Sequence, residues 1–169
     1  IKERRIAPDW MCTSDMAVEA ARRAMDQAGV RENEIDLIIC ATVTPDMPFP
    51  ATACLVQDRL GASKAGAFDL LAACSGFIFA LNMGTQAIRT GSIKNALIIG
   101  AETLSRVTDW SDRNTCVLFG DGSGAFVLQA SPEPGGVISA VMRSDGSGAD
   151  LLIVPGGGSH DSRTSVATN

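Results

Sequence analysis

Residues 67–90 constrain the fold of this chain more than any other stretch, because they join a buried strand to a buried helix with almost no linker. Ala67–Leu71 is short and apolar and follows Gly66, as expected for a strand that is buried on both faces. Phe77–Ile88 is apolar on nearly every side, which predicts a buried helix, and Gly91 is placed to end it. The stretch therefore predicts a strand, a sharp turn and a helix.

Cys74 lies at the junction of these two elements, about where the predicted helix begins. Small residues flank it (Ala72, Ala73, Ser75 and Gly76), so the chain can present the side chain at the carboxyl edge of the strand. The unpaired N–H groups and the dipole of a helix N-terminus stabilise a thiolate, which is the nucleophilic form of cysteine. The pattern resembles the serine elbow of hydrolases, which has a small residue two positions before the nucleophile and a glycine two positions after it. The pattern leaves two interpretations open, a nucleophile or a buried structural cysteine.

Helices and strands alternate along the rest of the chain. Helices are predicted over 15–28 and 51–60, and strands over 37–42, 66–71, 95–100, 125–130 and 137–142. Thr13 or Ser14 is expected to cap the first helix, with Gly29 past its end. This alternation predicts an α/β fold with a mostly parallel sheet sandwiched by helices. Sites in such sheets lie at the carboxyl ends of the strands, so we expect Cys74, the proline-rich loop 44–50 and the polar segment 101–114 to converge there.

Composition excludes several classes of function. A chain of 169 residues with 46% hydrophobic and 20% charged residues is expected to form one compact globular domain. A net charge of −5 and the absence of tyrosine leave no basic patch and no stacking platform for nucleic acid. Five cysteines, at positions 12, 40, 54, 74 and 116, form no C-x-x-C pair, which indicates free thiols in a reducing cytoplasm and no metal site. We expect no signal peptide, because the charged start Ile1–Arg5 is not followed by an apolar segment, and no apolar run is long enough to span a membrane.

Four further features of the sequence are candidate sites. The GDGSG stretch at 120–124 lacks nucleotide-binding spacing and is expected to be a close-packed turn between strands. The DGSGAD stretch at 145–150 lacks the ligand spacing of a calcium loop and is expected to be a surface turn. His160, the only histidine, lies in a Gly/Ser-rich segment that is a poor mount for a catalytic base. Arg113 is either a phosphate clamp or a solvated charge, and the local sequence favours the second interpretation.

Six segments of the chain together resemble β-ketoacyl-acyl carrier protein synthase III, the thiolase-fold enzyme that starts type II fatty-acid synthesis. The segments are IKERRIA, TPDMPFPATACLVQDRLG, AFDLLAACSGFIFAL, IIGAETLSR, DRNTCVLFGDGSGA and DLLIVPGGGS. The resemblance implies a fold of two similar α/β halves, each with a five-stranded sheet between helices. On this basis residues 1–136 are assigned to the N-terminal half without its first strand, and residues 137–169 to a linker and the start of the C-terminal half. We therefore expect a fragment of a longer protein.

The resemblance also implies roles for individual residues. Cys74 matches the nucleophile that takes an acyl group from acyl-CoA as a thioester, and its backbone N–H would supply half of an oxyanion hole. A carbanion from decarboxylated malonyl-acyl carrier protein then attacks that thioester. Arg113 matches an arginine at the adenine end of coenzyme A. Leu104 and Phe119 match positions that line the acyl pocket, and Phe49 matches a residue that reaches into the partner's pocket in a homodimer. Plain core packing is the alternative for these three apolar positions.

The chain also departs from the family pattern. No segment matches the catalytic His and Asn of the second half, or the Trp and Arg that grip coenzyme A from the N-terminal loop. We therefore expect these 169 residues alone to be inactive in condensation, and we expect no cofactor beyond acyl-CoA as substrate. Two alternatives remain. One is another thiolase-fold condensing enzyme, which makes polyketides, quinolones, alkylresorcinols or long-chain ketones. The other is a truncated, non-catalytic copy that only dimerises.

Overall fold

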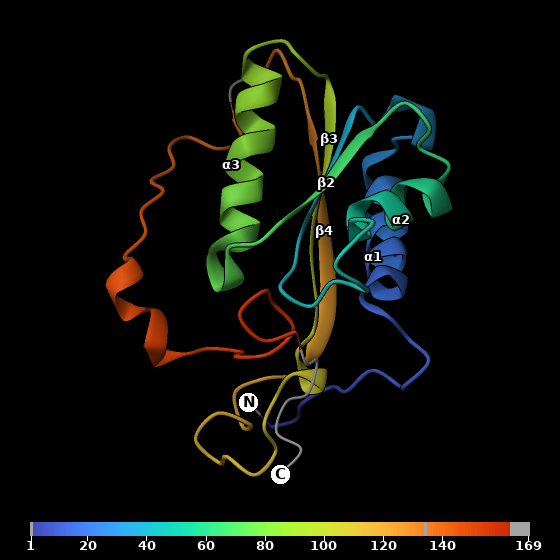
Figure 1. Cartoon of the computed structure of the whole chain (residues 1–169). Coiled ribbons are helices and arrows are strands. Elements are labelled where there is room, and N and C mark those ends of the chain that lie inside the picture. The colour runs from blue at the N-terminus through green and yellow to red at the C-terminus, as the bar shows by residue number, and fades with distance from the viewer. Residues whose placement is uncertain (1, 134, 163–169) are drawn as a thin grey trace.

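Figure 1 shows the computed structural model of the chain, which describes residues 2–133 and 135–162. Ile1, at the start of the IKERRIA segment, lies outside the described residues, as do Pro134 and residues 163–169 at the end of the segment assigned to the second half. The strands are β1 (Leu37–Ala41), β2 (Gly66–Leu70), β3 (Asn95–Thr103) and β4 (Asp121–Gln129). The helices are α1 (Thr13–Ala28), α2 (Thr52–Leu60) and α3 (Gly76–Arg89), with short 3-10 turns η1 (Glu32–Glu34), η2 (Ala73–Ser75), η3 (Leu104–Arg106) and η4 (Gly146–Leu151).

The four strands form one mixed sheet in the order β2-β1-β3-β4. β1 pairs in parallel with both β2 and β3, and β4 runs antiparallel to β3. Ala41, the last residue of β1, lies opposite Leu70 on one side and Gly100 on the other, so the parallel strands end at one edge. Helices α1 and α2 cover one face of the sheet and α3 covers the other (Figure 1). The predicted α/β sandwich is confirmed, with four strands among the described residues where five were expected.

Alternating side chains of the central strands build a core on each face of the sheet. Ile38 and Leu97 pack beneath α1 and α2, whereas their neighbours Ile39 and Ile98 pack beneath α3. All four are fully buried, and each such side chain contributes about 1.5–3 kcal/mol relative to exposure. Strands that are buried on both faces carry continuous apolar runs, and for this reason LIICA and NALIIG predicted strands from the sequence.

The helix ends agree with the sequence more closely at their C-termini than at their N-termini. Gly29 and Gly61 follow α1 and α2 with φ of 65° and 75°, left-handed conformations that favour glycine. The expected cap of α1 by Thr13 or Ser14 is wrong, because the helix already begins at Thr13. The Asp15 carboxylate instead accepts a hydrogen bond from the Cys12 N–H at 2.6 Å. Both hydroxyl residues are free to bond elsewhere in the tertiary structure.

Two predictions about strands are corrected by the structure. The GDGSG stretch is no turn, because residues 121–124 form the first half of β4 and pair with 100–103. β3 extends to Thr103, beyond its predicted end at Gly100, and so offers these glycines a partner strand. The strand predicted over 137–142 is absent, because no described strand pairs with it; Ile138 and Val141 are 91% and 74% exposed.

The expected burial of β2 and α3 on all sides is also wrong. β2 lies at the edge of the sheet, where it pairs only with β1, and its residues are at best half-buried. α3 buries only its sheet-facing small residues Gly76, Ala80 and Gly84, whereas Ile78 on another side is 53% exposed. A Cβ at Gly84 would lie 2.9 Å from the Ile98 Cδ1, so the helix packs directly onto the strands at this point.

Candidate active site

Cys74 lies in the short turn η2, which follows β2 and passes directly into α3. Its neighbour Ala73 has φ of 45° and is the only non-glycine residue with a positive φ in the described parts of the chain. A side chain with a Cβ costs about 1–2 kcal/mol in this conformation. The strained turn reverses the chain between strand and helix and leaves Cys74 exposed at the helix N-terminal end. Its exposure contradicts the alternative of a buried structural cysteine, while its role as nucleophile stays a prediction.

The five thiols differ in their surroundings. Cys40, in β1, is fully buried, and burial raises the pKa of its thiol. Cys12, Cys54 and Cys116 are partly buried, which leaves Cys74 as the one exposed cysteine of the five. A thiol that is both accessible and next to a helix N-terminus is the one best placed to react as a thiolate.

Three segments meet at the carboxyl edge of the parallel strands. The loop after β1 contains residues 44–50, η2 follows β2, and η3 with its following loop follows β3. Figure 1 shows the start of α3 and the loop after β1 at the same end of the sheet. The convergence follows from the parallel pairing, in which the carboxyl ends of all three strands point to the same edge, β3 continuing past Gly100 to Thr103.

Glu102, near the end of β3, holds the start of the loop after β1. Its carboxylate accepts hydrogen bonds from the Val43 N–H at 3.0 Å and from the Thr44 hydroxyl. Thr44 is held from two further sides: its hydroxyl accepts from the Thr103 N–H at 2.8 Å, and its carbonyl accepts from the Thr13 hydroxyl at 2.6 Å. Glu102 was not singled out in the sequence, where it looked like part of the polar segment 101–114. Its partners lie almost 60 positions away, and no local signal indicates them.

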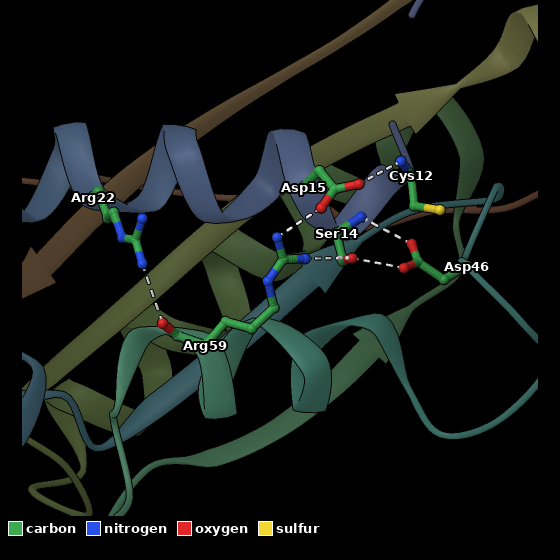
Figure 2. A network of polar contacts seen from close by, with 6 residues as sticks. All are labelled: Cys12, Ser14, Asp15, Arg22, Asp46 and Arg59. Carbon is green, nitrogen blue, oxygen red and sulfur yellow. Dashed lines mark hydrogen bonds and ion pairs between the residues drawn. The ribbon is translucent and has the colours of Figure 1, made fainter. Parts of the chain in front are cut away.

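A second polar network holds the middle of the same loop, as Figure 2 shows. Asp46 accepts hydrogen bonds from the Ser14 N–H at 2.8 Å and from the Ser14 hydroxyl at 2.6 Å. Arg59, from α2, donates to the Ser14 Oγ at 2.9 Å and to the Asp15 carboxylate at 2.6 Å. Burial opposes ionisation of Asp15, but the Cys12 N–H and the Arg59 guanidinium outweigh it and lower the pKa of that carboxyl. The network joins α1, α2 and the loop.

Asp69 connects the far end of the loop to the strand that leads to Cys74. Its two carboxylate oxygens accept from the Thr52 and Ala53 N–H groups, each at 2.7 Å. These are the first two residues of α2, so a carboxylate from β2 satisfies N–H groups that a helix leaves unpaired. Asp69 lies five positions before Cys74 in the sequence, so the same short segment carries the proposed nucleophile and anchors α2.

The structure spreads the other predicted site residues over this edge. Phe49 is 83% exposed at the tip of the loop after β1. Leu104, in η3, and Phe119, before β4, are half-buried. Arg113 is exposed in a turn that the Asp112 carboxylate orders by accepting from the Asn114 N–H and the Thr115 hydroxyl.

The described residues do not gather these positions into one pocket with Cys74. A hollow of about 380 Å³ lies between α3 and the sheet, and it is lined by Phe77, Gly100, Gly124, Ala125 and Phe126. It includes neither Cys74 nor the predicted acyl-pocket positions. His160 is exposed, and its segment has no regular secondary structure.

Residues 2–133 and 135–162 contain neither a metal-ligand cluster nor a membrane-spanning helix. No group of three or more His, Cys, Asp or Glu side chains in this part is arranged to hold a metal ion. None of its helices has the length and hydropathy needed to cross a membrane.

Comparison with known proteins places these features in a family. The profile described as 3-oxoacyl-[acyl-carrier-protein (ACP)] synthase III matches residues 68–146. The β-ketoacyl-[acyl-carrier-protein] synthase III of Caldanaerobacter subterraneus is 52% identical over 159 residues, which cover 94% of this chain and 48% of that protein. The chain thus spans about half the length of the curated relatives it matches.

Solved structures show the same relation. The β-ketoacyl-[acyl carrier protein] synthase III of Thermus thermophilus superposes with a TM-score of 0.85 at 45% identity, over 90% of this chain and 47% of that one. The priming β-ketosynthase of the R1128 polyketide pathway superposes with a TM-score of 0.79 at 38% identity, over 87% and 44%. The chain therefore belongs to the 3-oxoacyl-[acyl-carrier-protein] synthase III family and has part of its thiolase-like fold.

Proposed function

We propose that this chain carries the nucleophile of a condensing enzyme of fatty-acid synthesis, and that the nucleophile is Cys74. The observation that carries the proposal is the exposed thiol at the junction of β2 and α3, on the edge where three parallel strands end. Family membership supports it, since curated relatives are named β-ketoacyl-[acyl-carrier-protein] synthase III. The thiol lies in η2, which leads directly into the N-terminus of α3.

The proposed reaction has two stages. In the first, the Cys74 thiolate attacks the carbonyl carbon of acyl-CoA, the bond to the coenzyme A sulfur breaks, and coenzyme A leaves as the thiolate. The Cys74 N–H donates to the carbonyl oxygen as its negative charge develops. In the second, malonyl-acyl carrier protein loses carbon dioxide, and the resulting carbanion attacks the Cys74 thioester. The product is a β-ketoacyl-acyl carrier protein, and the thiolate is regenerated.

The remaining assignments belong to the same proposal. Arg113 binds the adenine end of coenzyme A, where its exposed turn leaves the guanidinium accessible. Leu104 and Phe119 line the acyl pocket, and Phe49 completes the pocket of a second copy in a homodimer. The exposure of Phe49 supports this role, because a side chain that is 83% exposed has room for a partner. The free cysteines fit a protein of the reducing cytoplasm.

We also propose that residues 1–169 alone do not complete the condensation, because no residues here match the family's His and Asn. Supplied with acetyl-CoA and malonyl-acyl carrier protein, they are expected to yield no β-ketoacyl product. Detection of that product by mass spectrometry would refute the expectation. A non-catalytic copy that only dimerises predicts, in addition, that Cys74 takes no acyl group.

The test of the nucleophile is the intact mass of the protein purified from its source, before and after incubation with acetyl-CoA. We expect the unaltered protein and Cys116→Ser each to gain the mass of one acetyl group, and Cys74→Ser to gain none. Cys116 is a suitable control because it is a partly buried thiol of the loop after β3. An acetyl group that persists in Cys74→Ser would contradict the assignment.

A second candidate function is the priming step of polyketide synthesis. The similarity to the priming β-ketosynthase of the R1128 pathway favours it. Both candidates use the same nucleophile, so acylation of Cys74 does not separate them. Competition among acyl-CoA primers, and between carrier proteins of fatty-acid and polyketide synthesis, does separate them through the ratio of kcat/KM values.

A further inference from the structure

The loop between β1 and α2 has an anchored stem and an exposed tip. Thr42 and Thr44 are buried, and the contacts to Glu102 hold them. Met47 and Phe49, in the tip, are 41% and 83% exposed. Asp46 lies between the two parts and is the last residue before the tip whose side chain has hydrogen bonds to another element. The position of the tip therefore depends on how Asp46 is held.

Asp46 is anchored through both oxygens of its carboxylate. One accepts from the Ser14 N–H at 2.8 Å and the other from the Ser14 hydroxyl at 2.6 Å. Ser14 is 3% exposed, in the first turn of a helix that packs on the sheet, so the anchor is rigid. The Asp46 N–H also donates to the Thr52 hydroxyl at 3.3 Å, which ties the loop to the start of α2.

Arg59 determines the direction of this contact. Its guanidinium donates to the Ser14 Oγ at 2.9 Å, so the Ser14 hydroxyl hydrogen is left to point at Asp46 (Figure 2). The other arm of the guanidinium, bonded to Asp15 at 2.6 Å, keeps Arg59 in place. A charged acceptor and a polarised donor make the Ser14–Asp46 bond stronger than a neutral one.

We propose that Asp46 is a positioning residue: held by Ser14 and Arg59, it sets where the loop tip lies and thereby which acyl groups Cys74 accepts. The proposal rests on the proposed function, in which Phe49 completes the acyl pocket of a second copy in a homodimer, so the Cys74 concerned is that of the second copy. Phe49 follows Asp46 by three positions, about 10 Å of extended chain, so release of the anchor lets the aromatic ring move relative to the pocket. Cys74 lies on another segment, and its own attachment to β2 and α3 is unchanged.

The experiment compares acyl-CoA selectivity in the full-length enzyme and its variants. Asp46→Ala removes the anchor, and Asp46→Asn keeps one carbonyl acceptor. Arg23→Ala is the matched control, because it removes an exposed ion pair with Glu19 on the same helix. For each, kcat/KM is measured with acetyl-CoA and with isovaleryl-CoA, together with the acylation stoichiometry of Cys74 and the Tm.

We expect Asp46→Ala to change the ratio of the two kcat/KM values by about tenfold, the effect of one charge-assisted hydrogen bond, mainly through KM. Asp46→Asn should retain most of the selectivity, and Arg23→Ala all of it. Ser14→Ala is a smaller change, because it removes the hydroxyl bond but keeps the bond from the Ser14 N–H to Asp46. It should shift the ratio of kcat/KM values in the same direction as Asp46→Ala. If Asp46→Ala does not fold, Ser14→Ala replaces it in the test. An unchanged ratio in the Asp46 and Ser14 variants with full acylation of Cys74 would overturn this proposal alone. Absence of acylation in the unaltered enzyme would overturn the proposed function and this proposal together.

Discussion

Replacing Asp69 by alanine should destabilise the protein strongly, because it leaves two buried donors without a partner. The Thr52 and Ala53 N–H groups belong to residues that are fully buried, and both donate to this carboxylate. An orphaned buried N–H costs about 1–3 kcal/mol, and loss of a negative charge at a helix N-terminus costs about 0.3–1 kcal/mol. Water that enters the vacated space recovers part of this sum. We therefore expect a loss of about 2–4 kcal/mol, a large part of the 5–15 kcal/mol typical of a whole domain.

Urea unfolding at neutral pH measures this loss. For a slope of about 2 kcal/mol per molar urea, the midpoint should fall by about 1–2 M with the slope unchanged. Asp69→Asn keeps the side-chain volume and one acceptor, so it should cost about half as much.

Asp145→Ala is the control. Asp145 also accepts from a backbone N–H and a hydroxyl, both of Ser147, but its side chain is exposed, so the change should stay within about 0.5 kcal/mol. The reasoning from burial would be wrong if the free energy of unfolding of Asp69→Ala were within about 0.5 kcal/mol of that of the unaltered protein. Water would then be satisfying the two N–H groups.

Three further predictions concern thiols, pH and backbone strain. Iodoacetamide should alkylate Cys74 before any other cysteine and leave Cys40 unmodified until the protein unfolds. Peptide mass mapping at increasing reaction times measures the order of labelling, and early labelling of Cys40 would contradict its burial. The pKa of Asp15 is lowered in the folded state, so its stabilising effect is complete above the unfolded pKa of about 3.9 and is lost as the pH falls through the folded value. The stability difference between the unaltered protein and Asp15→Asn should therefore shrink below about pH 4, and a difference that is constant from pH 7 to pH 2 would refute this. Gly29→Ala should cost about 1 kcal/mol in thermal unfolding, because φ is 65° and a Cβ there meets no other atom, so only backbone strain contributes; unchanged stability would argue against a left-handed cap.

Local patterns were sufficient for the buried central strands, for the end of α1 and for the position of Cys74 between a strand and a helix. LIICA and NALIIG are apolar throughout because strands buried on both faces have no solvent side. Gly29 follows the end of α1 as predicted, because glycine adopts the left-handed conformation of a C-cap more readily than other residues. The junction of strand and helix at Cys74 was also visible locally, since a strand, four small flanking residues and a helix lie within one short stretch.

Patterns failed where the answer depended on a partner distant in sequence. GDGSG looked like a turn because its glycines suit one, but pairing with the end of β3 made it a strand. Residues 137–142 looked like a strand but have no partner among the described strands. β2 and α3 were expected to be buried all round, whereas the sheet order placed β2 at an edge.

The sequence by itself determined the α/β class, most of the helices and strands, and the place of Cys74 between a strand and a helix, because periodicity, chain breakers and turn residues act over a few positions. The exposure of Cys74 came from the tertiary structure. Only the tertiary structure decided how the edge around that cysteine is held. Asp46 is hydrogen-bonded to Ser14, 32 positions away in the sequence, and Glu102 is hydrogen-bonded to Thr44, 58 positions away. A carboxylate can accept from any nearby donor, so the folded backbone selects its partner.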